Sequence, residues 1–188
     1  MEDLPSLIKL AYLFNGNFFL DHRIKQLANW IQNLQSKSIS IIHNSTKASI
    51  SLNDAWLSGF TDAEGCFNVT FVKRAAYIVG FRTVIRFILD QNNSSVLKFI
   101  LSLFNTGYIY HRKSSIGAYR YIVDSFKGLP TIVSYFDKFP LKTVKKEAFI
   151  KWSNIRSMMA NKEHLTHEGF AKIKVLAKSV NNKSNIND

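Results

Sequence analysis

Hydrophobic positions near the N-terminus recur with the spacing of helices. Residues 4–13 and 21–35 are predicted to form two helices, separated by a turn at Gly16. Asp21 is placed to cap the second of them. The apolar stripe of that second helix consists of Ile24, Leu27, Ile31 and Leu34.

The composition changes after the second helix. Residues 36–51 are rich in Ser, Thr, Asn and Lys, which is typical of a linker. A compact domain is therefore predicted over residues 52–180. A helical extension with its linker, residues 1–51, precedes that domain, and a polar, flexible tail, residues 181–188, follows it.

Within the domain the hydrophobic period changes from that of a helix to that of a strand. A short helix begins at Trp56, and apolar and polar residues then alternate over 67–72. Further strands are expected at 78–89, 108–112 and 118–123, and further helices at 94–104, 129–137, 149–159 and 170–180. This order predicts an α+β fold in which helices pack on one face of a four-stranded antiparallel sheet.

The free face of this sheet is expected to be basic. The chain carries 25 Lys and Arg against 13 Asp and Glu, a net charge of +12, which favours a polyanionic partner. Nucleic acid is the more common such partner and an anionic membrane the less common one. No apolar run approaches the roughly 20 residues of a membrane span.

Polar strand positions are the candidates for nucleic-acid contact, although exposed strand faces are polar in most proteins. The four arginines among them are candidates for reading guanine. The whole set comprises Asn68, Thr70, Arg82, Arg86, Tyr110, Arg112, Lys113 and Arg120.

One cysteine, Cys66, excludes an internal disulfide and a cysteine zinc site, and it is compatible with a reducing compartment. Acidic Glu2 and Asp3 suit neither a secretory signal nor an acid-poor transit peptide.

The short helix beginning at Trp56 has two unusual features. Gly59 and Ala63 are one turn apart, which lets a partner backbone approach closely. Asp62 and Glu64 stand just before Gly65, a predicted helix stop. Because the C-terminus of a helix is the negative end of its dipole, acids there need a positive charge beside them.

Residues Leu57 to Gly65, LSGFTDAEG, resemble the motif that names the LAGLIDADG homing endonucleases. Three later blocks are also similar to this family: RFILDQ at 86–91, YFDKFPLKTVKKEAFIKW at 135–152 and HLTHEGFAKI at 164–173. The resemblance covers almost all of the chain from Leu52 onward.

This resemblance implies a DNA-binding nuclease in which two such helices pack at small residues, here Ser58, Gly59 and Ala63. Glu64 would be a ligand of Mg²⁺, with Asp62 supporting the helix packing instead. The metal charge would then offset the helix dipole.

Two further catalytic residues follow from the same resemblance. Gln91 would position the attacking water. Lys145 would be the basic catalytic residue, with Lys142 and Lys146 as competitors. The alternative for each is an ordinary solvated polar side chain at the end of a helix or strand.

The chain departs from the two-motif members of the family because it has one motif. Residues 13–34 resemble the closing segment of the first half in such members, so the chain is expected to be a second half. It is predicted to be half of an organellar, mitochondrial Mg²⁺-dependent homing endonuclease that acts with a partner chain or as a homodimer. The alternative is an RNA-binding descendant without cleavage activity, either an intron maturase or a structural component of an organellar ribosome.

Overall fold

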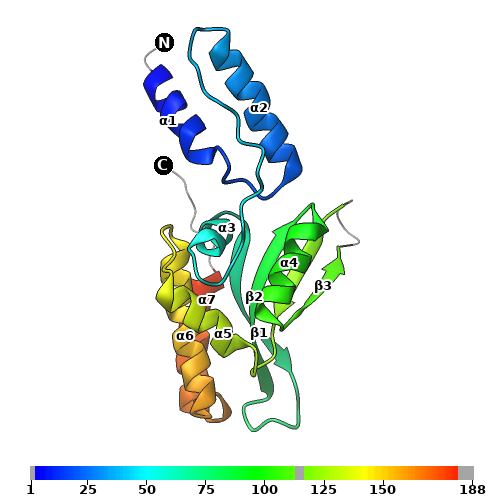
Figure 1. Cartoon of the computed structure of the whole chain (residues 1–188). Coiled ribbons are helices and arrows are strands. Elements are labelled where there is room, and N and C mark those ends of the chain that lie inside the picture. Colours follow the sequence, from blue (N-terminus) through cyan, green and yellow to red (C-terminus); the bar gives the residue numbers. More distant parts are fainter. Residues whose placement is uncertain (1–2, 113–116, 182–188) are drawn as a thin grey trace. The chain divides into compact units, whose positions relative to one another are not determined.

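Residues 3–112 and 117–181 are described by the computed structural model (Figure 1). The chain divides into two compact units, Met1–Ser51 and Leu52–Asp188. The predicted tail lies, apart from Asn181, outside the described residues. Within the described part of the chain, no helix is both long and apolar enough to cross a membrane.

The first unit consists of two helices and the extended chain that follows them. α1 (Leu4–Phe14) and α2 (Asp21–Gln35) form where the hydrophobic spacing predicted them. Gly16 between them has a φ of +81°, a left-handed conformation that glycine adopts without strain. The core of this unit consists of Ala11, Leu27, Ile31, Leu34 and Ile41.

The segment after α2 is not the featureless linker that its composition suggested. Ile41 is 1% exposed and belongs to the core of the first unit. The capping prediction for Asp21 is also wrong: Leu20 is the N-cap, and Asp21 lies in the first turn, where Lys47 Nζ pairs with it at 2.8 Å. Composition shows that a segment is polar on average, but not which of its few apolar residues pack.

The second unit is built on a four-stranded antiparallel sheet, which confirms the predicted α+β fold. Each neighbouring pair in the order β1-β2-β4-β3 is antiparallel. Gly65 pairs with Leu89 at one end of the β1–β2 ladder, and Lys73 pairs with Phe81 at the other. The strands are β1 (Gly65–Lys73), β2 (Phe81–Gln91), β3 (Tyr108–His111) and β4 (Tyr119–Val123).

Helices cover one face of this sheet (Figure 1). They are α3 (Trp56–Glu64), α4 (Ser94–Phe104), α5 (Leu129–Lys138), α6 (Lys145–Ala160) and α7 (His167–Asn181), with a short 3₁₀ turn η1 (Glu163–Leu165) between the last two. The covered face holds an aromatic core. The Phe67 ring of β1 lies 5.3–5.7 Å, between centroids, from the rings of Phe87, Phe136, Phe149 and Trp152. These rings supply much of the apolar burial that fixes the sheet against its helices.

Candidate active site and nucleic-acid interface

Helix α3 ends at Glu64, and strand β1 begins at the next residue, Gly65. The backbone conformation does not require glycine here, because Gly65 is extended, with a φ of −86° that any residue adopts. The requirement is steric. A Cβ there would lie 2.4 Å from Thr61 Cγ2 and 2.7 Å from the Thr61 carbonyl oxygen. The junction leaves the Glu64 side chain exposed, and its carboxylate accepts no hydrogen bond from the described residues.

Replacing Gly65 with Ala is expected to lower the free energy of unfolding by about 1–3 kcal/mol, the usual cost of overpacking. The added methyl must displace the backbone of α3, since Thr61 O cannot move alone. Urea denaturation measures the change. Gly59→Ala is the matched control, because nothing lies within 4 Å of its added Cβ. If both variants unfold with the wild-type free energy, the close approach at Gly65 is not a constraint.

A lysine provides the positive charge at the C-terminus of α3. Lys145 Nζ donates hydrogen bonds to the carbonyl oxygens of Thr61, at 3.1 Å, and Ala63, at 3.0 Å. Burial lowers the pKa of the Lys145 ammonium below its ordinary value, while the charges of Asp62, Cys66 and Glu64 act in the opposite direction. The family resemblance implies that a metal ion offsets the dipole of α3, but the Lys145 ammonium of the chain itself lies at this helix end.

The structure distinguishes Lys145 from the two competing lysines. Lys142 and Lys146 have exposed side chains, and among the described residues neither ammonium hydrogen-bonds to α3. Gln91 is the last residue of β2, two positions beyond Leu89, which pairs with Gly65. Its Oε1 accepts a hydrogen bond from Asn92 N at 2.8 Å. Register therefore brings Gln91 to the same end of the sheet as Glu64.

Asp62 joins α3 to the turn that leads into α6. Its carboxylate accepts hydrogen bonds from Lys142 N at 2.8 Å, Thr143 N at 3.3 Å and Thr143 Oγ1 at 2.6 Å. Because Lys145 follows this turn directly, Asp62 fixes the start of the helix that presents the Lys145 ammonium. These hydrogen bonds hold a turn of the same chain, and the expected support of packing between two such helices stays a prediction.

Replacing Asp62 with Ala is expected to lower the free energy of unfolding by about 1–2 kcal/mol, as for the loss of a helix cap. Three backbone and hydroxyl donors of the turn lose their acceptor. Asp62→Asn keeps one acceptor oxygen and should lose less. Thermal unfolding followed by circular dichroism compares the two variants. Equal loss in both would mean that the carboxylate charge, and not its hydrogen bonds, holds the turn.

Three side chains are joined by hydrogen bonds on the face of the sheet that the helices leave open. Arg86 Nη1 donates to Asn68 Oδ1 at 3.2 Å and to Thr70 Oγ1 at 2.9 Å. Arg82 is exposed on the same side of β2, because strand side chains alternate. Phe81, Thr83, Ile85 and Phe87 face the helices.

The β3–β4 end of the open face is organised by an acid that the sequence analysis missed. Asp90 accepts two hydrogen bonds from Arg120, and Arg112 Nη1 lies 3.5 Å from Asp90 Oδ2. Tyr110 stands opposite Arg120 in the β3–β4 ladder. The alternation of β2 places Asp90 on the same face as Arg86, but only the strand register shows that Arg120 lies opposite it. Lys113 lies outside the described residues.

Comparison with known proteins extends these observations. A sequence profile described as LAGLIDADG endonuclease matches residues 57–156. A protein named probable intron-encoded endonuclease 4, from Neurospora crassa, is 35% identical over the whole of this chain. This chain belongs to the LAGLIDADG endonuclease family. It spans 34% of the length of that Neurospora relative and 44% of an uncharacterised cox1 intron-2 protein from Schizosaccharomyces pombe, which is 29% identical over 85% of this chain.

Solved LAGLIDADG structures share the fold. The homing endonuclease I-TnaI superposes with a TM-score of 0.66 at 31% identity, over 72% of this chain and 90% of that one. The archaeal intron-encoded homing endonuclease I-Vdi141I, complexed with DNA, gives a TM-score of 0.65 at 28% identity over 71% and 84% of the two chains. The LAGLIDADG meganuclease I-AabMI, bound to uncleaved DNA, gives 0.63 at 33% identity, but only 50% of its chain is covered.

The small residues of the LAGLIDADG helix α3 do not all lie on one face. Gly59 and Ala63 are exposed. Ser58 is 3% exposed and donates a hydrogen bond to the Phe139 carbonyl oxygen at 2.5 Å. The expectation that Ser58 shares an exposed packing face is therefore wrong. Successive helix residues are about 100° apart, so Ser58 turns toward the LAGLIDADG domain's own α5 segment.

The donor set at the end of α3 fits half of a metal site. Among the described residues, no three His, Cys, Asp or Glu side chains gather closely enough to hold a metal ion. Glu64 offers one exposed carboxylate with no competing hydrogen bond from those residues. Oxygen donors of this kind suit Mg²⁺, provided that further oxygen ligands come from outside the chain.

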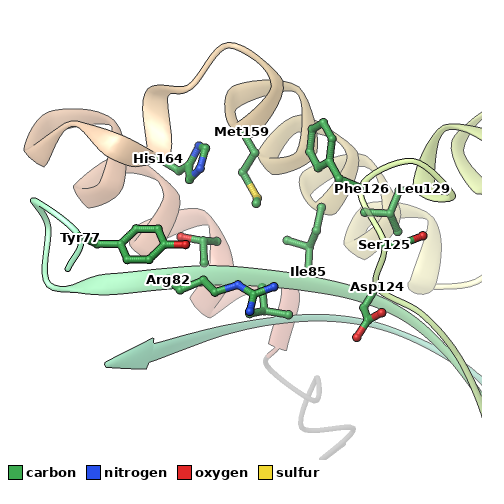
Figure 2. Close-up of a pocket in the computed structure, with 11 residues that line it drawn as sticks. Tyr77, Arg82, Ile85, Asp124, Ser125, Phe126, Leu129, Met159 and His164 are labelled. Carbon is green, nitrogen blue, oxygen red and sulfur yellow. The ribbon is translucent and has the colours of Figure 1, made fainter. Parts of the chain in front are cut away.

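A cavity lies elsewhere in the LAGLIDADG domain, between the sheet and the helices (Figure 2). Its volume is about 340 Å³, and Figure 2 shows His164 and Met159 on one side of it and Ile85 on the other. Thr83 Oγ1 and His164 Nδ1 have no hydrogen-bond partner among the described residues, and burial lowers the pKa of His164. None of the predicted catalytic residues lines it, whereas Arg82, a predicted nucleic-acid contact, does.

Proposed function

We propose that this chain is half of a metal-dependent DNA endonuclease and that it cuts duplex DNA together with a second LAGLIDADG motif. The observation that carries the proposal is the end of α3, where an exposed Glu64 stands beside the Lys145 ammonium. The basic open face of the sheet begins at the same helix–strand junction. A carboxylate, a cation and a polyanion-binding surface are thus combined in one place.

The need for a second motif follows from the donor count and from an uncovered helix face. One carboxylate supplies only part of the octahedral oxygen shell of Mg²⁺, and a second motif would bring another carboxylate to it. A Cβ on Gly59 would meet nothing within 4 Å, so another helix has room to approach there. The solved relatives support both arrangements, because this chain covers 90% of I-TnaI but 44% of the DNA-bound meganuclease I-CpaMI. A second copy and a separate first half are therefore the two candidate partners.

The reaction is hydrolysis of a phosphodiester bond. Bound Mg²⁺ would supply positive charge for water activation and for the pentavalent phosphate. In this assignment Glu64 would hold the ion at the end of α3, and Gln91 would orient the attacking water from the end of β2. Lys145 stabilises negative charge that develops on the phosphate oxygens, while its hydrogen bonds to Thr61 and Ala63 keep α3 in place.

The cellular compartment is proposed from the names of relatives. One Schizosaccharomyces pombe relative is named for a cox1 intron and one from Podospora anserina for an ND4 intron, both genes of fungal mitochondria. We accordingly place this chain in a mitochondrion.

A second candidate function is RNA binding without cleavage, as an intron maturase or a component of an organellar ribosome. The observation that favours it is the net charge of +12 on a chain with a single carboxylate at the motif's end. It predicts salt-dependent binding that needs no metal.

Purification of the chain with its native companions tests the proposal. A second protein that resembles a first LAGLIDADG half, or a homodimer, together with Mg²⁺-dependent nicking of DNA is the expected result. A stoichiometric RNA or ribosomal companion, with no cleavage at any Mg²⁺ concentration, would replace it with the RNA-binding function.

A further inference from the structure

Asp90 is an acid on a face that also carries Arg82, Arg86, Arg112 and Arg120. Arg120 Nε donates to Asp90 Oδ1 at 2.6 Å, and Arg120 Nη2 donates to Asp90 Oδ2 at 2.5 Å. The side chains of Arg120 and Asp90 are 24% and 35% exposed, so solvent screens the pair only in part. The hydrogen bonds to Asp90 raise the pKa of the Arg120 guanidinium above its ordinary value.

The geometry of this pair leaves the end edge of the guanidinium uncommitted to Asp90, with the Tyr110 hydroxyl as a weaker further partner of Arg120. A guanidinium has five N–H donors, and Asp90 takes one from Nε and one from Nη2. The edge formed by Nη1 and the second hydrogen of Nη2 is the one that pairs with the O6 and N7 acceptors of guanine in the major groove. A carboxylate bound to the side edge thereby fixes the direction of the end edge and lowers the conformational entropy that base contact costs.

The other arginines of the open face are held differently. Arg86 hydrogen-bonds to Asn68 and Thr70, which are neutral and leave its full charge available to phosphate. Arg82 is exposed. Arg112 is 3.5 Å from Asp90 Oδ2, a looser contact than that of Arg120. Arg120 therefore differs from Arg82 and Arg86. Asp90 both neutralises its charge and fixes its rotamer.

We propose that Asp90 is a specificity-determining residue, which orients Arg120 to read one guanine of the DNA target at the expense of non-specific affinity. The inference rests on the proposed DNA-binding function. Asp90 contributes nothing to phosphate binding, because its charge has the sign of the phosphates. Its contribution is discrimination between bases.

Selection of bound duplexes from a library with randomised positions tests this inference. The wild-type chain is expected to enrich guanine at one position, and Asp90→Asn is expected to reduce that preference by about tenfold, as when one bidentate contact is lost. Binding of Asp90→Asn to sonicated genomic DNA should become tighter, since Arg120 and Arg112 gain free charge.

Two further variants separate orientation from charge. Asp137→Asn makes the same change in net charge on the exposed surface of α5 and should keep the wild-type base preference. Arg120→Lys keeps the charge but lacks the planar guanidinium that donates two parallel hydrogen bonds. It should therefore lose guanine preference as Asp90→Asn does.

The outcomes of the selection are distinguishable. Unchanged guanine preference in Asp90→Asn, with normal binding by the wild type, would overturn the role of Asp90 and leave the proposed function standing. A wild-type chain that binds no duplex DNA even together with its LAGLIDADG partner would overturn both.

Discussion

Replacing Glu64 with Gln is expected to abolish DNA cleavage and leave DNA binding nearly unchanged. The amide has the shape of the carboxylate but not its charge, so it is a poor ligand for a hard cation. The loss of several kcal/mol of transition-state stabilisation corresponds to a rate reduction of about a thousandfold or more. Because the Glu64 carboxylate accepts no hydrogen bond from the described residues, the fold should tolerate the change.

Two assays separate the effects on chemistry and on binding. Strand cleavage is followed with Mg²⁺, and DNA affinity is measured with the metal removed by chelation. A variant that cleaves at the wild-type rate would eliminate Glu64 as a metal ligand. A variant that neither cleaves nor binds would mean that Glu64 is needed for the fold or for partner assembly instead.

Replacing Lys145 with Met is expected to slow cleavage by about 10²- to 10³-fold, the usual effect of removing one donor that stabilises developing charge. The reaction should also acquire a different pH profile. Burial lowers the pKa of Lys145, so in the wild type the ammonium loses its proton at a lower pH than an ordinary lysine does. Wild-type activity should therefore fall as the pH rises through that lowered pKa, and the Met variant should lack this fall.

Lys146→Met is the matched control, because it removes an exposed lysine from the next position of the same helix. Its cleavage rate and pH profile should stay close to those of the wild type. Equal losses in the two variants would indicate a general effect of positive charge on DNA affinity and not a role for the Lys145 ammonium at α3.

The periodic elements of the domain could be predicted from the sequence because their signals are local. Helix α4 occupies the predicted residues 94–104, and α3 ends just before Gly65 as expected. Strand boundaries were less accurate: β2 begins at Phe81 and not at residue 78, because residues 74–80 form a turn closed by Arg74 N to Gly80 O at 2.9 Å.

Contacts between distant segments could not be predicted in the same way. The motif identified α3 and the block around Lys145, but not that the Lys145 ammonium hydrogen-bonds to the α3 carbonyls. The pairing of Asp90 with Arg120 depends on the β2–β4 register, which no local pattern encodes. Ser58 was placed on the wrong face because small size alone does not distinguish a residue that packs inside its own domain from one that faces a partner.

The measurement that tests the central claim most directly is cleavage of duplex DNA by the chain together with its native companion. A plasmid library with randomised inserts is incubated with Mg²⁺, with Ca²⁺ and with chelator, and cut molecules are sequenced. The account predicts a defined set of cut sequences with Mg²⁺, no cutting with chelator, and none with the Glu64→Gln chain in the same complex. Cutting that persists in the Glu64→Gln complex, or specific binding with no cutting in Mg²⁺, would contradict it.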